Sequence, residues 1–462
     1  MYVYLNGRKV DFYDGETVIE LARREGVEVP SLCYARGARH RASCMVCSVR
    51  DRVTGQFFPA CSTLPAGGMD IDTDSEEVRQ LRVMSIELLL SDHRADCEAP
   101  CKTACPAGFD IAAMNRLYDA GDIDGAREFL RDGLVVPATL CYLCNAPCER
   151  VCRRKDLDMP VGIREIKKLL AAGTRAEAIV PPAGNGRRVA VVGSSPAGLS
   201  AAYRLRRLGY ETTVFERAEA ALVPHIEAGK VPAATVAAEL EAIERTGVRI
   251  ATSCGEVSFG DYDGLVSDGS AARHPREAVI TARTRQPARL VLEGFRAAAK
   301  LAAILSGKGG GDAGDNAGDN AGGDADNVRL FGSTYGRFSE AERLDLSERS
   351  AGDKRPSRCL HCDCDRKTDC RLRDCATRFG IKSPRYSRET SLRALDRRRA
   401  GAGLGFEAAK CIRCGLCVYN SENGFTFAAR GFDMRVMLPP GNEANVDGRL
   451  TELCPTGALY AL

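Results

Sequence analysis

The sequence contains no tryptophan and only 5 histidines, and aromatic residues make up 6% of its 462 positions. It also lacks a continuous run of about 18 apolar residues, so we expect no membrane-spanning helix. The opening segment, MYVYLNGRKVDF, lacks the apolar core of a signal peptide, and we therefore expect a cytoplasmic protein. The formal net charge of +3 gives no reason to expect nucleic-acid binding.

Cysteine is the abundant residue, with 21 in the chain. Thiols stay reduced in the cytoplasm, so clustered cysteines there indicate metal binding or catalysis rather than disulfides. Eleven lie between Cys33 and Cys152 and nine between Cys359 and Cys454, whereas Cys254 stands alone. This distribution predicts two metal-rich regions separated by a domain of a different kind.

The first cysteine group has the spacing C-x10-C-x2-C-x13-C, at Cys33, Cys44, Cys47 and Cys61. The residues before it predict a β-hairpin with an Asn-Gly turn, then a helix that begins after Thr17. Four soft thiolate ligands from one long loop, with only one close pair, favour a 2Fe–2S cluster in a β-grasp domain. A four-cysteine zinc site is the alternative, although zinc knuckles normally use two close pairs.

Residues 1–93 resemble the N-terminus of the iron–sulfur large subunit of complex I and the accessory domain of iron-only hydrogenases. In those families a 2Fe–2S domain is followed by a helix and a His-x3-Cys cluster motif. The corresponding helix here is SEEVRQLRVMSIELLLSD with Ser75 as its cap, and His93-x3-Cys97 follows it. The resemblance implies that His93 is a cluster ligand, and a surface histidine is the alternative.

The next stretch, DCEAPCKTACPAGFDI and then CYLCNAPCERVCRRKDLDMPVGIREIKKLL, is similar to the N-terminal helical domain of the glutamate synthase small subunit and of dihydropyrimidine dehydrogenase. That domain binds two 4Fe–4S clusters. The family places a Gln or Glu ligand where Lys167 stands here, but an ammonium group has no lone pair to offer a metal. We therefore predict that the extra thiol of Cys141 is the fourth ligand instead. Carried over by position, the two ligand sets are Cys97, Cys101, Cys152 and His93, and Cys105, Cys144, Cys148 and Cys141.

RRVAVVGSSPAGLSAAYRLRRLGYETTVFER predicts a strand, a glycine turn, a helix and a second strand. The glutamate synthase resemblance implies an FAD-binding domain here, with Gly193, Ser195, Gly198 and Glu216 at the cofactor-binding positions. Ser195 replaces the second glycine of the motif, and its Cβ obstructs the approach of a pyrophosphate. The chain also has no room for the NAD(P)H-binding insertion of that family before residue 306. We predict a truncated domain with a structural role, and retained FAD is the alternative.

The C-terminal region holds two further groups. RCLHCDCDRKTDC predicts a 4Fe–4S cluster, with zinc as the alternative, and its ligands are Cys359, Cys362, Cys364 and Cys370. KCIRCGLCV and LCPTGAL form half of a bacterial ferredoxin motif, which predicts a 4Fe–4S cluster held by Cys411, Cys414, Cys417 and Cys454. This last part also resembles the ferredoxin insert of formate dehydrogenases and complex I large subunits. Cys254 and Cys375 are left over.

The length and these motifs predict a multidomain protein of mixed α+β and α/β class. Residues 306–328 form a Gly/Asp/Asn tract without apolar anchors, which is typical of a flexible linker. The expected segments are a β-grasp 2Fe–2S domain at 1–76, a helical domain with two 4Fe–4S clusters at 77–180, a truncated Rossmann-like FAD/NAD(P)-binding-like domain at 181–305, the linker at 306–328, a cysteine-rich cluster segment at 329–398 and a ferredoxin-like 4Fe–4S domain at 399–462.

Together the sets predict one 2Fe–2S cluster and three to four 4Fe–4S clusters. We find no motif for bond chemistry, so we predict a non-catalytic electron-transfer subunit of an oxidoreductase complex. Its expected partners are an NAD(P)H-linked flavin subunit and a catalytic subunit of the hydrogenase or formate dehydrogenase type. The alternatives are a flavoenzyme like the glutamate synthase small subunit, a flavin-based bifurcating subunit and a zinc-stabilised scaffold without redox chemistry.

Overall fold

A computed structural model gives the fold of the chain. The described residues are 1–93, 96–172, 183–222, 229–267, 274–281, 284, 286–307, 356–366, 368–381, 385–386, 397–401 and 403–462. They form two compact units, of which unit 1 holds the described residues of Met1–Glu98 and Asp363–Leu462. Unit 2 holds those of Ala99–Val328 and Leu344–Cys362. Most of the predicted linker, 306–328, lies outside the described residues.

Unit 1 begins with five short strands: β1 (Tyr2–Leu5), β2 (Arg8–Asp11), β3 (Ser48–Asp51), β4 (Phe57–Pro59) and β5 (Asp70–Asp72). They form one sheet in the order β2-β1-β5-β3-β4. Asn6 and Gly7 have positive φ values of 50° and 81°, and this turn pairs β1 with β2 in antiparallel register, as the sequence predicts. Val3 and Leu5 are buried whereas the residues beside them are exposed, so one face of β1 belongs to the core.

Two capped helices belong to the same part of unit 1: α1 (Val18–Arg24) and α2 (Glu76–Asp92). Before α1, the Glu20 carboxylate accepts the backbone N–H of Thr17 at 3.0 Å and its hydroxyl at 2.7 Å. Before α2, the Ser75 hydroxyl accepts the Val78 N–H at 3.5 Å. Both predicted helix starts are therefore confirmed.

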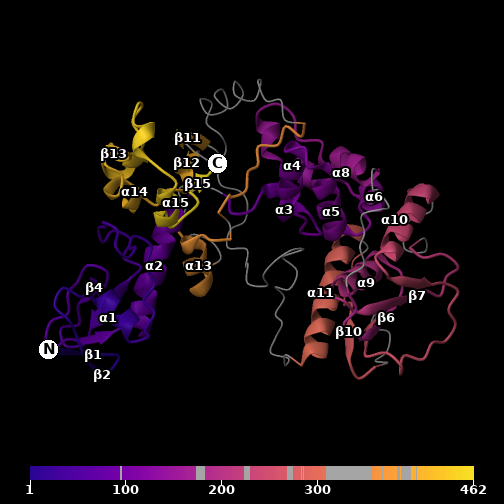
Figure 1. Cartoon of the computed structure of the whole chain (residues 1–462), viewed down its shortest axis with the longest axis horizontal. Helices are drawn as coiled ribbons and strands as arrows, with labels where there is room; N and C mark the ends of the chain where they lie inside the picture. The colour runs from indigo at the N-terminus through magenta and orange to yellow at the C-terminus, as the bar shows by residue number, and fades with distance from the viewer. Residues whose placement is uncertain are drawn as a thin grey trace. The chain divides into compact units, whose positions relative to one another are not determined.

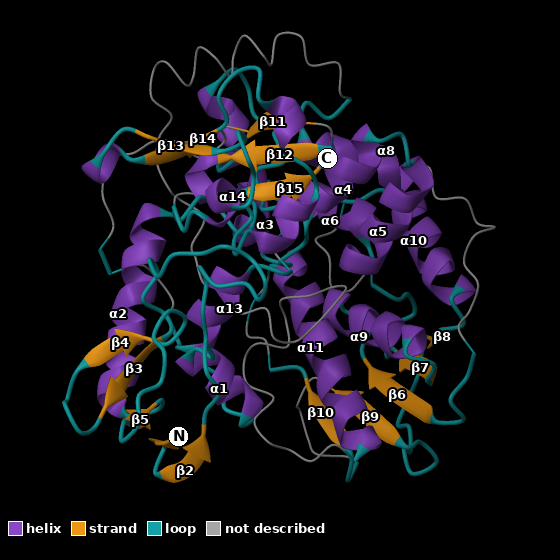
Figure 2. Cartoon of the chain, turned by 60° about the vertical axis from the view of Figure 1, so that its left-hand side comes forward, coloured by secondary structure: helices purple, strands orange, loops and turns teal. Residues whose placement is uncertain are grey.

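The C-terminal part of unit 1 contains α13 (Arg371–Arg378), α14 (Leu416–Tyr419), α15 (Arg449–Leu453), β11 (Arg397–Gly401), β12 (Leu404–Glu407), β13 (Thr426–Ala428), β14 (Arg435–Met437) and β15 (Leu459–Ala461). Strand β12 lies between β11 and β15, and β13 pairs with β14 (Figure 2). The Asn420 side chain accepts the Arg39 N–H at 2.9 Å and donates to the Arg39 carbonyl at 2.7 Å. The two sequence-distant parts of unit 1 are thus in direct contact.

Unit 2 begins with a helical part: α3 (Pro100–Ala104), α4 (Ile111–Asp119), α5 (Ile123–Leu134), α6 (Pro137–Leu143), α7 (Pro147–Arg150) and α8 (Ile163–Ala172). Asp110 and Asp122 cap α4 and α5, since each carboxylate accepts a backbone N–H of the first turn at 3.0 Å. Ile111 and Leu130 are buried in a hydrophobic core that this helical part shares with the sheet of unit 2.

The sheet of unit 2 is parallel, with β6 (Arg188–Val192), β7 (Glu211–Phe215), β8 (Arg249–Ala251), β9 (Gly264–Ser267) and β10 (Glu277–Val279). Its strand order is β10-β9-β6-β7-β8, and α10 (Ala233–Arg245) precedes β8. Helix α9 (Pro196–Arg207) joins β6 to β7 and packs against α11 (Pro287–Ser306) (Figure 1). A Cβ on Gly294 of α11 would lie 2.1 Å from the Ala197 carbonyl oxygen, so only glycine permits this close packing.

The predicted segment 329–398 is divided between the two units, because the chain returns to unit 1 at Asp363. Cys359 and Cys362 therefore belong to unit 2, whereas Cys364 and Cys370 belong to unit 1. The rest of that segment before residue 356 lies outside the described residues. Within the part of the chain that the structure describes, no helix is both long and apolar enough to cross a membrane.

Candidate metal centres

The first predicted ligand set comes together around β3 and β4 of unit 1. The Cys33 thiol forms hydrogen bonds with the thiols of Cys44 and Cys61, and Cys47 forms one with Cys61. Hydrogen bonds from Cys44 and Cys61 lower the pKa of Cys33, and the bonds with Cys33 and Cys47 raise the pKa of Cys61. All four thiols are buried, and the structure brings the four predicted residues together.

A buried arginine beside this set is a residue that sequence reasoning missed. Arg82 on α2 donates to the Ser48 carbonyl at 3.1 Å, and burial lowers its pKa to about 10. Its Nη2 is buried and has no hydrogen-bond partner within the described residues, and the Cys47 thiol is the nearest negative charge that favours its cationic form. The sequence contains a sign of this buried arginine, because Arg82 lies midway between Val78 and Ile86 in a series of apolar residues spaced four apart.

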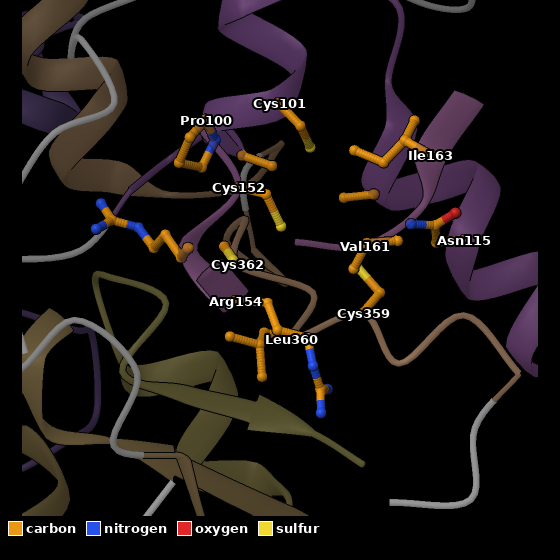
Figure 3. A pocket seen from close by; sticks show the side chains of 13 residues that line it. Pro100, Cys101, Asn115, Cys152, Arg154, Val161, Ile163, Cys359, Leu360 and Cys362 are labelled. Atoms are coloured by element: carbon orange, nitrogen blue, oxygen red, sulfur yellow. The ribbon is translucent and has the colours of Figure 1, made fainter. Parts of the chain in front are cut away.

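Unit 2 holds a second four-cysteine site. Figure 3 shows that the thiols of Cys101, Cys152, Cys359 and Cys362 line one cavity, whose other walls include Val161. Burial raises the pKa of Cys101 well above its usual value, and the neighbouring thiols of Cys362, Cys359 and Cys152 raise it further. This grouping differs from the predicted one, which placed Cys359 and Cys362 with the cysteines that follow them.

Contacts with the helical part of unit 2 hold the returning segment 357–362 at this cavity. The Asp119 carboxylate at the end of α4 accepts the Ser357 N–H at 2.8 Å and the Ser357 hydroxyl at 2.6 Å. The His361 Nε2 lies 3.0 Å from the same carboxylate. Arg358 also forms an ion pair with Asp158. These contacts explain why Cys359 and Cys362 belong to unit 2 although their sequence neighbours do not.

The third set surrounds a buried lysine in unit 2. Burial raises the pKa of Cys141 to about 11 and that of Cys148 to about 12. Lys167 on α8 is also buried, and this burial alone would lower its pKa. The thiols of the set outweigh that effect and raise the pKa; they are Cys105, Cys148, Cys141 and Cys144. The structure therefore brings the four predicted thiols to one cation.

A fourth set forms in unit 1 where the chain leaves and returns. The Cys364 N–H donates to the Cys97 carbonyl at 3.2 Å, and the charges of Cys370 and Cys364 add to burial in raising the pKa of the Cys97 thiol. A Cβ on Gly457 would lie 2.3 Å from the Cys364 sulfur, so glycine leaves space at this thiol. Cys97 was predicted to share a cluster with Cys101, which belongs to unit 2.

His93 stands four residues before Cys97 in the chain. Its Nδ1 is 3.1 Å from the Lys410 carbonyl oxygen, and a Cβ on Gly457 would meet both the Cys364 sulfur and the Lys410 side chain. His93 is buried, and this burial together with the Lys410 charge lowers its pKa to about 4. The imidazole is therefore neutral at physiological pH and keeps a lone pair for a metal, while its other nitrogen can donate to the carbonyl.

The fifth set follows the ferredoxin motif. The thiols of Cys411, Cys414, Cys417 and Cys454 line one cavity of unit 1, together with Pro455 and Leu459. Burial raises the pKa of Cys411 to about 12 and raises that of Cys417 well above its usual value. The structure thus brings the four residues of this predicted set together.

The donors in these five sets fit iron–sulfur clusters. Thiols with raised pKa values become thiolates only when bound to a cation, which a cluster supplies. Backbone N–H groups donate to the sulfurs of Cys144, Cys359 and Cys411 at 3.4 Å, a contact that tunes cluster potentials. Among the described residues, no three His, Cys, Asp or Glu side chains surround one point closely enough for a single metal ion.

The predicted nucleotide-binding positions keep the backbone shape of that motif. Gly193 has a φ of 89°, and a Cβ on Gly198 would lie 2.0 Å from the Gly193 carbonyl oxygen. The polar groups, however, bind one another: the Ser195 hydroxyl accepts the Gly198 N–H at 3.2 Å, where a phosphate oxygen would bind. The Glu216 carboxylate accepts the Ser194 N–H at 2.9 Å and the Ser194 hydroxyl at 2.6 Å. These contacts do not fit a bound dinucleotide.

Three segments match known domain families. Residues 2–76 match the "2Fe-2S iron-sulfur cluster binding domain", and residues 90–179 match "Dihydropyrimidine dehydrogenase domain II, 4Fe-4S cluster". Residues 191–221 match the "NAD(P)-binding Rossmann-like domain". The chain is thus a multidomain iron–sulfur protein with 2Fe–2S and 4Fe–4S domains and a Rossmann-like fragment.

Its relatives are subunits of oxidoreductases. The chain is 34% identical over 180 residues to the NADP(+)-dependent formate dehydrogenase subunit beta of Moorella thermoacetica, covering 33% of this chain and 26% of that protein. It is 34% identical over 122 residues to the NADPH-Fe(3+) oxidoreductase subunit beta of Geobacter sulfurreducens, covering 26% of this chain and 18% of that protein. It is 30% identical over 162 residues to the NAD-dependent dihydropyrimidine dehydrogenase subunit PreT of Escherichia coli, covering 33% and 39%. The chain thus spans well under half of each relative.

Proposed function

We propose that the chain is an electron-transfer subunit that carries one 2Fe–2S cluster and four 4Fe–4S clusters. The observation that carries this proposal is the cavity lined by Cys101, Cys152, Cys359 and Cys362, in which four thiols from three separate segments point to one space. Thiolates in such an arrangement bind cubane clusters. When bound, these clusters exchange single electrons, and the protein's part is to hold them in order and to tune their potentials.

The five ligand sets use the same nineteen cysteines that the sequence selects, together with His93. Every 4Fe–4S set then has four ligands from one unit, whereas the predicted grouping combined His93 and Cys97 of unit 1 with Cys101 and Cys152 of unit 2. The sets are Cys33, Cys44, Cys47 and Cys61; Cys411, Cys414, Cys417 and Cys454; His93, Cys97, Cys364 and Cys370; Cys101, Cys152, Cys359 and Cys362; and Cys105, Cys141, Cys144 and Cys148.

Electrostatic effects between neighbouring sets suggest the order of electron transfer. In unit 1, Cys33 of the 2Fe–2S set helps to raise the pKa of Cys414 in the ferredoxin-like set, and Cys454 helps to raise the pKa of Cys370. In unit 2, Cys148 of the third set helps to raise the pKa of Cys101. Cys362 and Cys364 are two residues apart, so their Cα atoms are at most about 7 Å apart and the chain itself connects the two series. The proposed path therefore runs from the 2Fe–2S set to the set around Lys167.

The names of the relatives support a pyridine-nucleotide-linked complex. We propose that this chain works with an NAD(P)H-linked flavin subunit at one end and a catalytic subunit of the hydrogenase or formate dehydrogenase type at the other. The Rossmann-like fragment has a structural role in this proposal, because Ser195 and Glu216 are bound within the protein. The chain transfers electrons without a bond-forming site of its own.

A flavoenzyme is the second candidate, since residues 191–221 match an NAD(P)-binding family. Acid release of flavin from anaerobically purified protein separates the two: we expect no stoichiometric FAD, and one FAD per chain would favour the flavoenzyme.

The main test is metal analysis of the anaerobically purified full chain. Five clusters predict about 18 irons with a matching amount of acid-labile sulfide. Reduction should produce EPR signals of both 2Fe–2S and 4Fe–4S type. A colourless protein that contains zinc and no labile sulfide would show that the chain is a scaffold instead.

A further inference from the structure

A cavity of about 510 Å³ opens on unit 1 beside the segment that carries Cys33. Its walls are the end of α1, residues 26–31, residues 34–36 and Arg371 at the start of α13. None of the thiols in the five ligand sets lines it. The cavity is therefore separate from the cluster sites, and its volume is in the range of sites that bind ligands.

The lining of this cavity is strongly basic. It contains Arg23, Arg36 and Arg371, and its only carboxylate, Glu28, lies 3.0 Å from Arg378 in an ion pair. Arg23 and Arg36 are exposed, and neither forms an ion pair within the described residues, although the Arg36 charge helps to lower the pKa of Glu20 and Arg23 lies over the Tyr34 ring. Exposed guanidinium groups attract anions, and they bind carboxylates in a bidentate manner.

One wall of the cavity connects two cluster loops. The Arg371 side chain donates to the Tyr34 carbonyl at 3.3 Å and to the Leu453 carbonyl at 2.7 Å. Tyr34 follows Cys33 of the 2Fe–2S set, and Leu453 precedes Cys454 of the ferredoxin-like set. A group bound in the cavity therefore lies next to the backbone of two ligand loops.

The basic surface continues beyond the cavity along residues 34–41. This segment, YARGARHR, contains Arg36, Arg39 and Arg41 and no acidic residue, and all three arginines are exposed. A small anion needs only the cavity, whereas an extended acidic segment can contact the cavity and the loop together. The charge complementarity thus favours a protein partner.

We propose that the cavity and residues 34–41 bind an acidic segment of a redox partner protein, which docks there to exchange electrons with the 2Fe–2S site. The electron exchange in this inference rests on the proposed function, but the binding of an acidic segment does not depend on it. Electrostatic attraction between such surfaces raises association rates and weakens as salt screens the charges.

The test uses the full chain and a fluorescein-labelled oligoglutamate peptide as the probe. Binding is followed by fluorescence anisotropy in about 50 and about 300 mM NaCl, concentrations that change the screening length. The test variant is Arg23→Glu/Arg36→Glu, and the matched control is Arg8→Glu/Lys9→Glu on β2, which makes the same charge change on exposed residues of the same unit. The 2Fe–2S EPR signal of each sample is recorded separately, so that loss of the cluster is distinguished from loss of binding.

We expect the wild-type chain and the control to bind alike, with weaker binding at high salt, and the Arg23/Arg36 variant to bind at least about tenfold more weakly. Equal binding by both variants, or an equal loss in both, would overturn the proposal. If inorganic phosphate displaces the peptide and NaCl of the same ionic strength does not, the cavity is a small-anion site and the protein partner is wrong. An absent EPR signal with unchanged binding would contradict the proposed function alone.

Discussion

The regrouped ligand sets can be tested by counting irons in double variants. Cys359 shares a cavity with Cys101 in unit 2, whereas Cys364 lies beside Cys97 in unit 1. A variant that lacks two ligands of one cubane loses one cluster, and therefore about four irons. A variant that lacks one ligand in each of two cubanes loses two clusters, and therefore about eight irons. From a wild-type content of about 18 irons, Cys101→Ala/Cys359→Ala should retain about 14 and Cys359→Ala/Cys364→Ala about 10.

The assay is iron and labile sulfide per chain in protein purified without oxygen, with EPR of the reduced samples. Each single variant, Cys359→Ala or Cys364→Ala, should keep about 14 irons and serves as the reference for its double variant. Near-ultraviolet circular dichroism reports whether the chain is still folded. If Cys359→Ala/Cys364→Ala loses only four irons, as adjacent ligands of one cluster would, our grouping is wrong.

Four further experiments test other parts of the structure. Cys411→Ser should remove about four irons and one cubane EPR signal while the 2Fe–2S signal persists, and loss of both signals would contradict separate sites. His93→Ala should alter one cubane signal, which His93→Cys should restore with changed potential; an unaltered spectrum would reject His93 as a ligand. Gly294→Ala should destabilise unit 2 by about 1–3 kcal/mol in urea unfolding, because its Cβ would meet the Ala197 carbonyl, and unchanged stability would refute this packing. Burial raises the pKa of Glu239 to about 7, so the folded protein is stabilised while this carboxyl group is protonated and loses that stabilisation as the pH rises through this value. The free energy of unfolding should therefore fall by roughly 2 kcal/mol from about pH 5.5 to 8.5. The variant Glu239→Gln should not show this fall.

Three of the five proposed sets keep the grouping predicted from the sequence: two follow from motifs, and the set around Lys167 follows from the family resemblance. The ligands of the first set come from one stretch of chain, and those of the ferredoxin-like set come from a close run and the remote Cys454 of the same motif. The strand–helix–strand unit and the caps at Thr17 and Ser75 were predictable for the same reason, since each depends on residues a few positions apart.

The two sets that the sequence grouped differently depend on contacts between distant residues. Cys359 and Cys362 look like partners of Cys364 because they are adjacent. Contacts with distant residues separate them, among them the hydrogen bond that the Asp119 carboxylate accepts from Ser357 and its contact with His361. Spacing within a motif carries no information about such a separation. The sequence shows that Arg82 interrupts an apolar helix pattern, but such an interruption does not show which group the charged side chain faces.

The chain leaves unit 1 at Glu98 and returns at Asp363. The proposed set of His93, Cys97, Cys364 and Cys370 takes members from both sides of this excursion, and the proposed set of Cys101, Cys152, Cys359 and Cys362 joins the two ends of unit 2. During synthesis, the ribosome must therefore complete all of unit 2 before either site has its full complement of thiols. Closing so long a loop has an entropic cost that a bound cluster offsets. Cluster insertion at these two sites is thus a late step that acts as a checkpoint on the whole fold, whereas the 2Fe–2S domain can mature while the rest of the chain is still being made.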